Sequence, residues 1–69
     1  MTSLDDSLLA AHASGDHWAL VNLYLQAADQ ANDLDASCFY LTHAYVFALE
    51  QNHPAQNDIR ARLRRHGRI

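Results

Sequence analysis

The stretch FYLTHAYVFALEQNHP, residues 39–54, decides the fold of this chain. It is too long for an ordinary β-strand, and it is too polar to span a membrane. A helix drawn through it carries apolar side chains on nearly every side. We therefore expect other helices to cover it on more than one side. The apolar residues concerned are Phe39, Tyr40, Leu41, Ala44, Val46, Phe47 and Leu49.

Composition places the whole chain in the same structural class. The 69 residues are 49% hydrophobic, which is enough apolar surface to offset the entropy lost on ordering. Two Gly and one Pro are too few for the many turns of an all-β fold. One domain of this size buries only about 60% of its unfolded surface, so we expect marginal stability.

The expected compartment is the cytoplasm. No uncharged apolar run reaches the length of a membrane span, and the start MTSLDDSLLA has acids where a secretory signal needs Lys or Arg. The single cysteine, Cys38, cannot form an internal disulfide. We expect it to be an inert residue of a helix contact.

Start and stop signals divide the chain into four helices, at residues 4–14, 17–31, 36–51 and 54–66. Ser3 with Asp6, or Thr2 with Asp5, resembles a capping start for the first helix. Gly15 fits the left-handed position at the end of that helix. The other expected signals are Asp16 as the cap of the second helix, Asp33 or Asp35 as the cap of the third, and Pro54 in the first turn of the fourth.

A displacement of 38 positions superimposes much of the apolar pattern. Leu25 falls on Leu63, Val21 falls on Ile59, and the turn SGD falls on NHP. Matched helices with matched turns are typical of stacked helical hairpins. The sequence therefore predicts an all-α, four-helix array of stacked antiparallel helical hairpins, either as a short repeat or as a bundle.

Three motifs extend this interpretation to a family. LVNLY, ASCFYLTHA and the turn SGD together resemble the Sel-one-like repeat, a relative of the tetratricopeptide repeat, over residues 7–66, or somewhat under two repeats. The resemblance implies a scaffold or adaptor that binds another protein. It also implies that Asn22, Tyr24 and Gln26 face the partner from an inner helix.

The short length leaves two arrangements open. Stacked repeats generally need about three units to be stable, and this chain has fewer than two. The first, second and fourth helices could close around the third as a bundle. Alternatively, the exposed side of the third or of the first helix could pair with a second copy, as a homodimer.

Charge is divided unevenly along the chain. Residues 1–58 carry all eight acids, and the basic residues are Arg60, Arg62, Arg64, Arg65 and Arg68. The simplest interpretation is that these arginines complement the end of a helix and offset the acidic body. One alternative is that the arginines contact another protein. The other is that they contact nucleic acid, which the sequence favours less because the segment has no aromatic residue to stack on bases.

No catalytic centre, cofactor site or metal site is expected. His12, Asp16 and His17 could meet across a turn, but titratable surface histidines are the more common explanation. Helix capping explains the paired acids Asp5–Asp6 and Asp33–Asp35. A helical domain of this size also leaves little room for a substrate pocket, so we do not expect an enzyme.

The aromatic residues complete the candidate binding surface. We expect Trp18 and Tyr40 to pack between helices, and Tyr45 to be an exposed anchor. The sequence thus favours a small cytoplasmic adaptor that uses an aromatic helix face and the Arg-rich C-terminal helix; the alternative is a nucleic-acid- or ribosome-associated protein. The candidate partner-binding residues are Asn22, Tyr24, Gln26, Tyr45, Arg60, Arg62, Arg64, Arg65 and Arg68.

Overall fold

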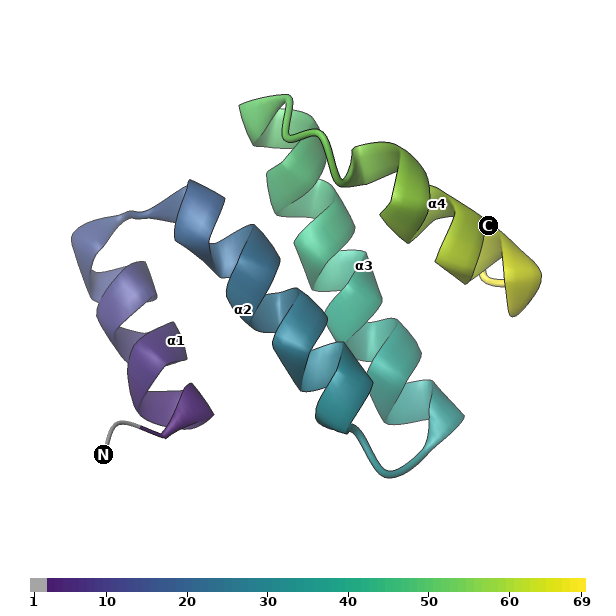
Figure 1. Cartoon of the computed structure of the whole chain (residues 1–69), viewed down its shortest axis with the longest axis horizontal. Helices are drawn as coiled ribbons and strands as arrows, with labels where there is room; N and C mark the ends of the chain where they lie inside the picture. Colours follow the sequence, from purple (N-terminus) through teal and green to yellow (C-terminus); the bar gives the residue numbers. More distant parts are fainter. Residues whose placement is uncertain (1–2) are drawn as a thin grey trace.

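Four α-helices and short connections make up the computed structural model, which describes residues 3–69 (Figure 1). The helices are α1 (Leu4–Ser14), α2 (His17–Gln30), α3 (Leu34–Gln51) and α4 (Gln56–Arg65). No strand occurs in the described part of the chain. The predicted all-α helical array is confirmed.

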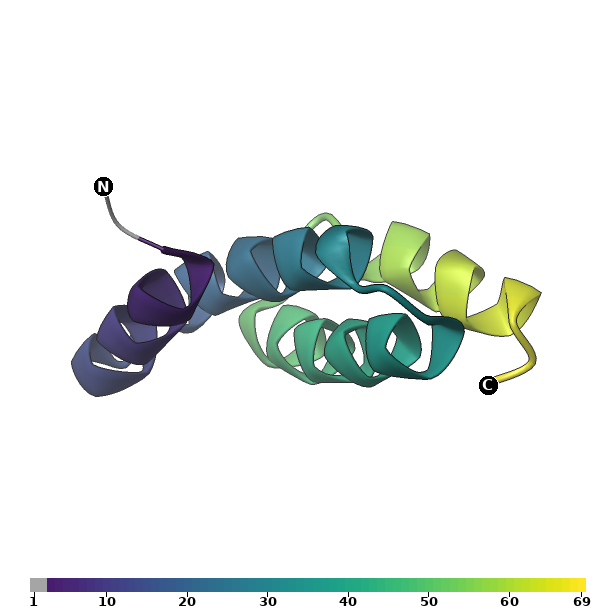
Figure 2. The ribbon, with the colours of Figure 1, turned by 90° about the horizontal axis from the view of Figure 1, so that it is seen from below.

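Each helix packs against the next one in the chain. Helix α2 lies between α1 and α3, and α4 lies against α3. Figure 2 shows α3 beneath α2 and α4, with α1 at the outer edge of α2. The resulting body is flat, with extents of 33 × 28 × 13 Å, so several helices keep one face open.

Side-chain caps fix the beginnings of the first three helices. The backbone N–H groups of Asp6, Ala19 and Ala36 donate to Ser3, Asp16 and Asp33, respectively, at 2.7–3.1 Å. The alternative cap, Thr2, lies outside the described residues. Because Asp33 is the cap of α3, this helix begins at Leu34, two residues earlier than the predicted start.

The two hairpin turns share one conformation. Gly15 and Asn52 both adopt the left-handed region, with φ of 68° and 51°, and their N–H groups bond to carbonyls at the end of the preceding helix. The next N–H bonds back to Ala11 and Ala48, respectively. These left-handed residues are 37 positions apart, and the buried pair Val21 and Ile59 is 38 positions apart. The second turn is the longer one: residues 15–16 connect α1 to α2, whereas residues 52–55 connect α3 to α4.

That longer turn corrects the predicted start of the fourth helix. Pro54 lies in the turn, and the backbone of Ala55 begins the helical bonding by accepting from Ile59 N–H. Helix α4 therefore starts at Gln56, two residues after the predicted start. A proline is compatible with the first turn of a helix but does not require one there.

We expect Gly15→Ala to destabilise the protein by about 1 kcal/mol, because a β-carbon is strained in the left-handed conformation. No atom lies within 4 Å of the added carbon, so the cost is conformational and not steric. Gly67 has nearly the same φ but sits near the chain end, where fraying can relieve the strain. Urea unfolding of both alanine variants checks this; equal losses would contradict it.

The hydrophobic core lies between α2, α3 and α4. Small residues on α3 let the neighbouring helices approach closely, and larger residues from all three helices fill the remaining volume. Cys38 is buried there, as predicted. The core residues are Val21, Ala28, Cys38, Leu41, Ala44, Ala48, Ile59 and Leu63.

The predicted enclosure of α3 is only partly correct. Helices α2 and α4 cover two of its sides, but α1 packs against α2 and not along α3. Phe39, Val46 and Leu49 remain 57%, 56% and 51% exposed on the outer face of α3. Within residues 3–69, no helix is both long enough and apolar enough to cross a membrane.

Candidate functional site: an aromatic groove between α1 and α3

Tyr24 lies at the centre of the most distinctive surface of the molecule. It projects from α2 toward the space that separates α1 from α3. Its hydroxyl lies 2.9 Å from Nε2 of His12 on α1. Its ring stacks with Phe47 of α3, with centroids 6.0 Å apart and planes within 11° of parallel. Tyr24 therefore connects the two walls of a groove whose floor is α2.

Helix α3 supplies most of the rings in this groove. His43 lies between Tyr24 and Phe39, with ring centroids 5.2 and 4.4 Å away. Tyr40 extends the row, at 5.6 Å from Phe39 and 6.3 Å from Tyr24. The spacing of these residues along α3 places them on neighbouring turns of one side. We call the aromatic groove the set His12, His17, Tyr24, Phe39, Tyr40, His43 and Phe47.

One end of the groove is closed by a polar contact between α2 and α3. Nδ1 of His17 lies 2.7 Å from the Glu50 carboxylate, and the His17 ring is 5.0 Å from Phe47. His12 approaches Phe47 edge-on from the opposite wall, at 6.1 Å. The two histidines that flank the first turn thus meet on Phe47.

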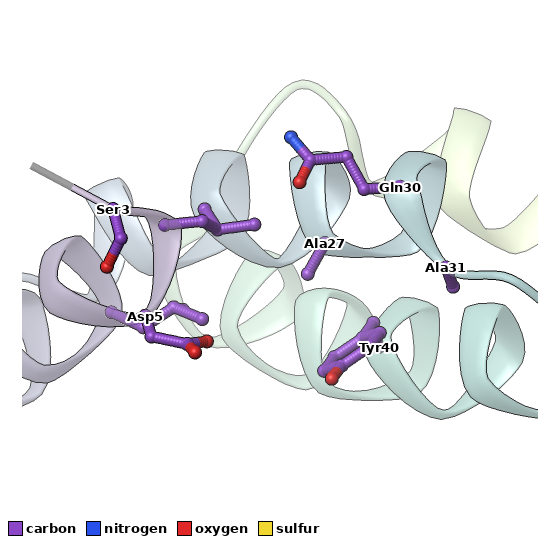
Figure 3. Close-up of a pocket in the computed structure, with 8 residues that line it drawn as sticks. Ser3, Asp5, Ala27, Gln30, Ala31 and Tyr40 are labelled. Carbon is purple, nitrogen blue, oxygen red and sulfur yellow. The ribbon is translucent and has the colours of Figure 1, made fainter.

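The other end of the groove widens into a hollow of about 270 Å³ (Figure 3). Asp5 and Tyr40 face each other from α1 and α3, and α2 contributes Ala27 and Gln30 to the lining. The hollow combines a carboxylate, an amide and a phenol with apolar walls, so it can accept both polar and apolar groups. The remaining lining residues are Ser3, Leu4, Leu8 and Ala31.

The position of Tyr24 affects its acidity. Partial burial raises the pKa of Tyr24 above its usual value of 10.0, and the nearby Tyr40 raises it further. The unfolded chain therefore loses this proton at a lower pH than the folded chain does. The stability linked to Tyr24 is complete below about pH 10 and is lost as the pH rises through the folded pKa.

Tyr24→Phe is expected to remove this alkaline loss while retaining the ring packing. Urea unfolding of the variant and the natural chain between neutral pH and pH 11 measures the difference. We expect the natural chain to lose more stability above pH 10 than the variant does. A parallel decline in both proteins would contradict the assignment.

The predicted binding residues on α2 do not form one surface. Two positions along a helix differ by about 200°, so Asn22 and Gln26 lie on the opposite side of α2 from Tyr24. Both are exposed. Only Tyr24 faces the groove.

Tyr45 corrects a second expectation. It is half-buried and packs against the core cluster, so it is not the predicted exposed anchor. The exposed aromatic residue of α3 is Phe39, which the sequence pattern did not single out as a binding residue.

Two of the five arginines have partners within the chain. Arg62 bonds to Asp29 of α2 at 2.8 Å, and Arg68 bonds to Asp35 at the start of α3. The remaining three, Arg60, Arg64 and Arg65, are exposed, and no carboxylate pairs with them among residues 3–69.

The histidines near the first turn contact different residues. His12 contacts Tyr24, His17 contacts Glu50, and Asp16 caps α2, so the three do not converge. Across residues 3–69, no group of three or more His, Cys, Asp or Glu side chains is placed to hold a metal ion. His43 is half-buried, and its Nδ1 lies 2.9 Å from the carbonyl oxygen of Phe39.

One aromatic contact was not anticipated from the sequence. Trp18 is 47% exposed, and its ring packs 4.3 Å from that of His53, which is buried in the second turn. Nδ1 of His53 accepts a hydrogen bond from Ala55 N–H. The pair fastens the start of α2 to the turn before α4, and only the packing of the two hairpins brings these residues together.

Comparison with protein-family models, with curated proteins and with solved structures gave no match.

Proposed function

We propose that this chain is a protein-binding module and that its aromatic groove receives a segment of a partner protein. The observation that carries the proposal is the row of seven rings across α1, α2 and α3. Aromatic side chains provide large contact areas at low entropic cost, and they are frequent at the centres of interfaces. Phe39 remains mostly exposed, so part of the row has no partner within the chain.

The charges around the groove favour a basic and apolar segment. Asp5 lies in the hollow at one end, and Glu50 lies at the other. All arginines follow residue 59, and the chain has no lysine. A Lys or Arg of the partner could therefore pair with a carboxylate while its stem packs on Tyr40 or Phe47.

The arginine contacts support a structural role for part of the C-terminal segment. Arg62 and Arg68 balance acids of α2 and α3, as expected if the segment offsets the acidic body. Arg60, Arg64 and Arg65 support the alternative function, which is contact with nucleic acid. The segment has no aromatic residue for base stacking, and the acidic remainder of the chain repels phosphates.

The proposed class is a small cytoplasmic adaptor of the Sel-one-like kind. Two features support this assignment: the two similar left-handed turns, and the packing of each helix against the next one in the chain. A buried cysteine is compatible with a reducing compartment. In this proposal no cofactor or metal takes part, and the chain acts by binding.

Affinity capture from nuclease-treated lysate tests the proposal with three paired variants. His12→Ala with Tyr40→Ala removes a side chain from each wall of the groove. Asn22→Ala with Gln26→Ala changes the opposite face of α2, and Arg60→Glu with Arg64→Glu reverses charge on α4. Circular dichroism and urea unfolding establish that each bait is folded.

We expect a captured protein, once identified and purified, to bind the groove variant at least about 10-fold more weakly than the natural chain. The variant at Asn22 and Gln26 should bind normally. Unchanged affinity of the groove variant would overturn the proposal. Two results together would favour nucleic acid as the partner: nuclease treatment abolishes the capture, and only the variant at Arg60 and Arg64 fails to capture in its absence.

A further inference from the structure

Three of the seven rings in the aromatic groove are imidazoles. His12 lies on α1, His17 on α2 and His43 on α3, so each helix that forms the groove contributes one. Histidine is the side chain whose ordinary change of charge falls between pH 5 and 8. The charge of the groove therefore depends on pH near neutrality.

The polar contacts of the three rings remain possible when the rings are charged. Nδ1 of His17 faces a Glu50 carboxylate oxygen at 2.7 Å, and Nδ1 of His43 faces the Phe39 carbonyl oxygen at 2.9 Å. Because these oxygens only accept, both nitrogens already carry a proton, and a second proton binds at Nε2. Nε2 of His12 faces the hydroxyl of the central tyrosine, whose oxygen can accept from a charged ring. A fall in pH therefore adds charge to the groove without breaking these contacts.

The other charges at the groove are carboxylates. Asp5 lies on α1 and Glu50 on α3, and Asp16 caps the start of α2. The remaining titratable groups are the phenols Tyr24 and Tyr40, and phenols in general are uncharged near neutral pH. All five arginines lie on α4 or after it, and α4 packs against α3 and not against α1. Carboxyl groups in general keep their charge down to about pH 5, so three charged imidazoles would offset the negative charge of the groove.

We propose that the three histidines make the aromatic groove a pH-sensitive switch, which binds a basic partner segment at neutral pH and releases it when the pH falls. The switch rests on the proposed function, in which a lysine or arginine of the partner pairs with a carboxylate of the groove. Two effects act in the same direction. Charged imidazoles repel the cation of the partner. Charged His17 also forms a full ion pair with Glu50, which withdraws that carboxylate from the partner.

His53 responds to acid in a different way. It is buried in the second turn, outside the groove, and its Nδ1 accepts from Ala55 N–H at 3.0 Å. A proton on that nitrogen would break this hydrogen bond, so acid acts on the fold at His53 and not on the charge of the groove. Folding and binding therefore have to be measured separately.

The protein captured from nuclease-treated lysate, once purified, is the probe, and its affinity for the full chain is measured at about pH 7.5 and about pH 5.5. We expect the natural chain to bind at least about 10-fold more weakly at the lower pH. A triple variant, His12→Gln, His17→Gln and His43→Gln, cannot take up these protons. Its affinities at the two pH values should agree within about threefold, whatever its affinity at neutral pH. His66→Gln is the matched control, because His66 is exposed and follows α4; it should show the same loss as the natural chain.

Circular dichroism and urea unfolding at the lower pH establish that each protein is folded. Equal affinity of the natural chain at the two pH values would overturn the switch, and so would the same loss in the triple variant. If binding is independent of pH but His12→Ala with Tyr40→Ala still abolishes it, only the switch fails. If that groove variant binds normally at neutral pH, the proposed function fails and the switch fails with it.

Discussion

Leu41→Ala is expected to lower the free energy of unfolding by about 2–5 kcal/mol. Leu41 is 1% exposed and lies in the core where α2, α3 and α4 meet. Alanine would leave a cavity at this position. The neighbouring core residues of α3 include Ala44 and Ala48, whose side chains are too short to move into it.

The loss is large compared with the total. Domains are stabilised by roughly 0.05–0.15 kcal/mol per residue, which gives about 3–10 kcal/mol for 69 residues. The substitution should therefore remove a large share of the stability of the chain. Urea unfolding followed by circular dichroism measures the change. Leu9→Ala removes the same atoms from a leucine that is 68% exposed, and a comparable loss there would contradict the assigned core.

Ending the chain at Asn57 is expected to have an equal or greater effect. This truncation removes Ile59 and Leu63, which are both buried, and with them the part of the core that α4 supplies. Complete burial of two such side chains is worth about 3–6 kcal/mol. The shortened chain should lose cooperative thermal unfolding and most of its helical signal.

A shorter truncation provides the control. Ending the chain at Gly67 removes Arg68 and Ile69, both exposed, together with the surface pair between Arg68 and Asp35. Its thermal unfolding should change little, since exposed ion pairs contribute little to stability. If the chain ending at Asn57 unfolded as cooperatively as the natural one, the placement of α4 in the core would be wrong.

Because truncation of α4 is expected to unfold the chain, the function of the arginines has to be tested with point variants.

The sequence predicted the elements that depend on local chemistry. Caps such as Ser3 and Asp16, and the left-handed Gly15, act within a few residues, so the first helix and the start of the second were located correctly. The start of α3 was predicted too late because Asp33 and Asp35 were both suitable caps. The start of α4 was predicted too early, at Pro54, because proline is compatible with a loop as well as with the first turn of a helix.

The pairwise packing of helices was harder to predict. The helical pattern of residues 39–54 required cover on more than one side but did not specify which helices provide it. An outer face with three large apolar residues has the same sequence pattern as an enclosed one. For this reason the spacing of the apolar residues could not show that Phe39 is exposed and that Tyr45 is partly buried.

The aromatic groove was missed for the same reason. Asn22, Tyr24 and Gln26 were grouped through a family resemblance, although helical geometry places Tyr24 on the opposite side of α2 from the other two. The sequence allowed His12 and His17 to meet across the turn but favoured separate surface histidines; in the structure each ring packs against Phe47. Identifying that ring required knowing how α3 lies against α2.

Site-specific photocrosslinking tests the central claim most directly. A photoreactive phenylalanine analogue at Tyr40 places the reactive group in the groove, and the same analogue at Asn22 places it on the opposite face of α2. In nuclease-treated lysate, we expect the Tyr40 position to form a covalent adduct with one defined protein and the Asn22 position to form none. An adduct from Asn22 alone, or no adduct from either position, would contradict a protein-binding groove between α1 and α3.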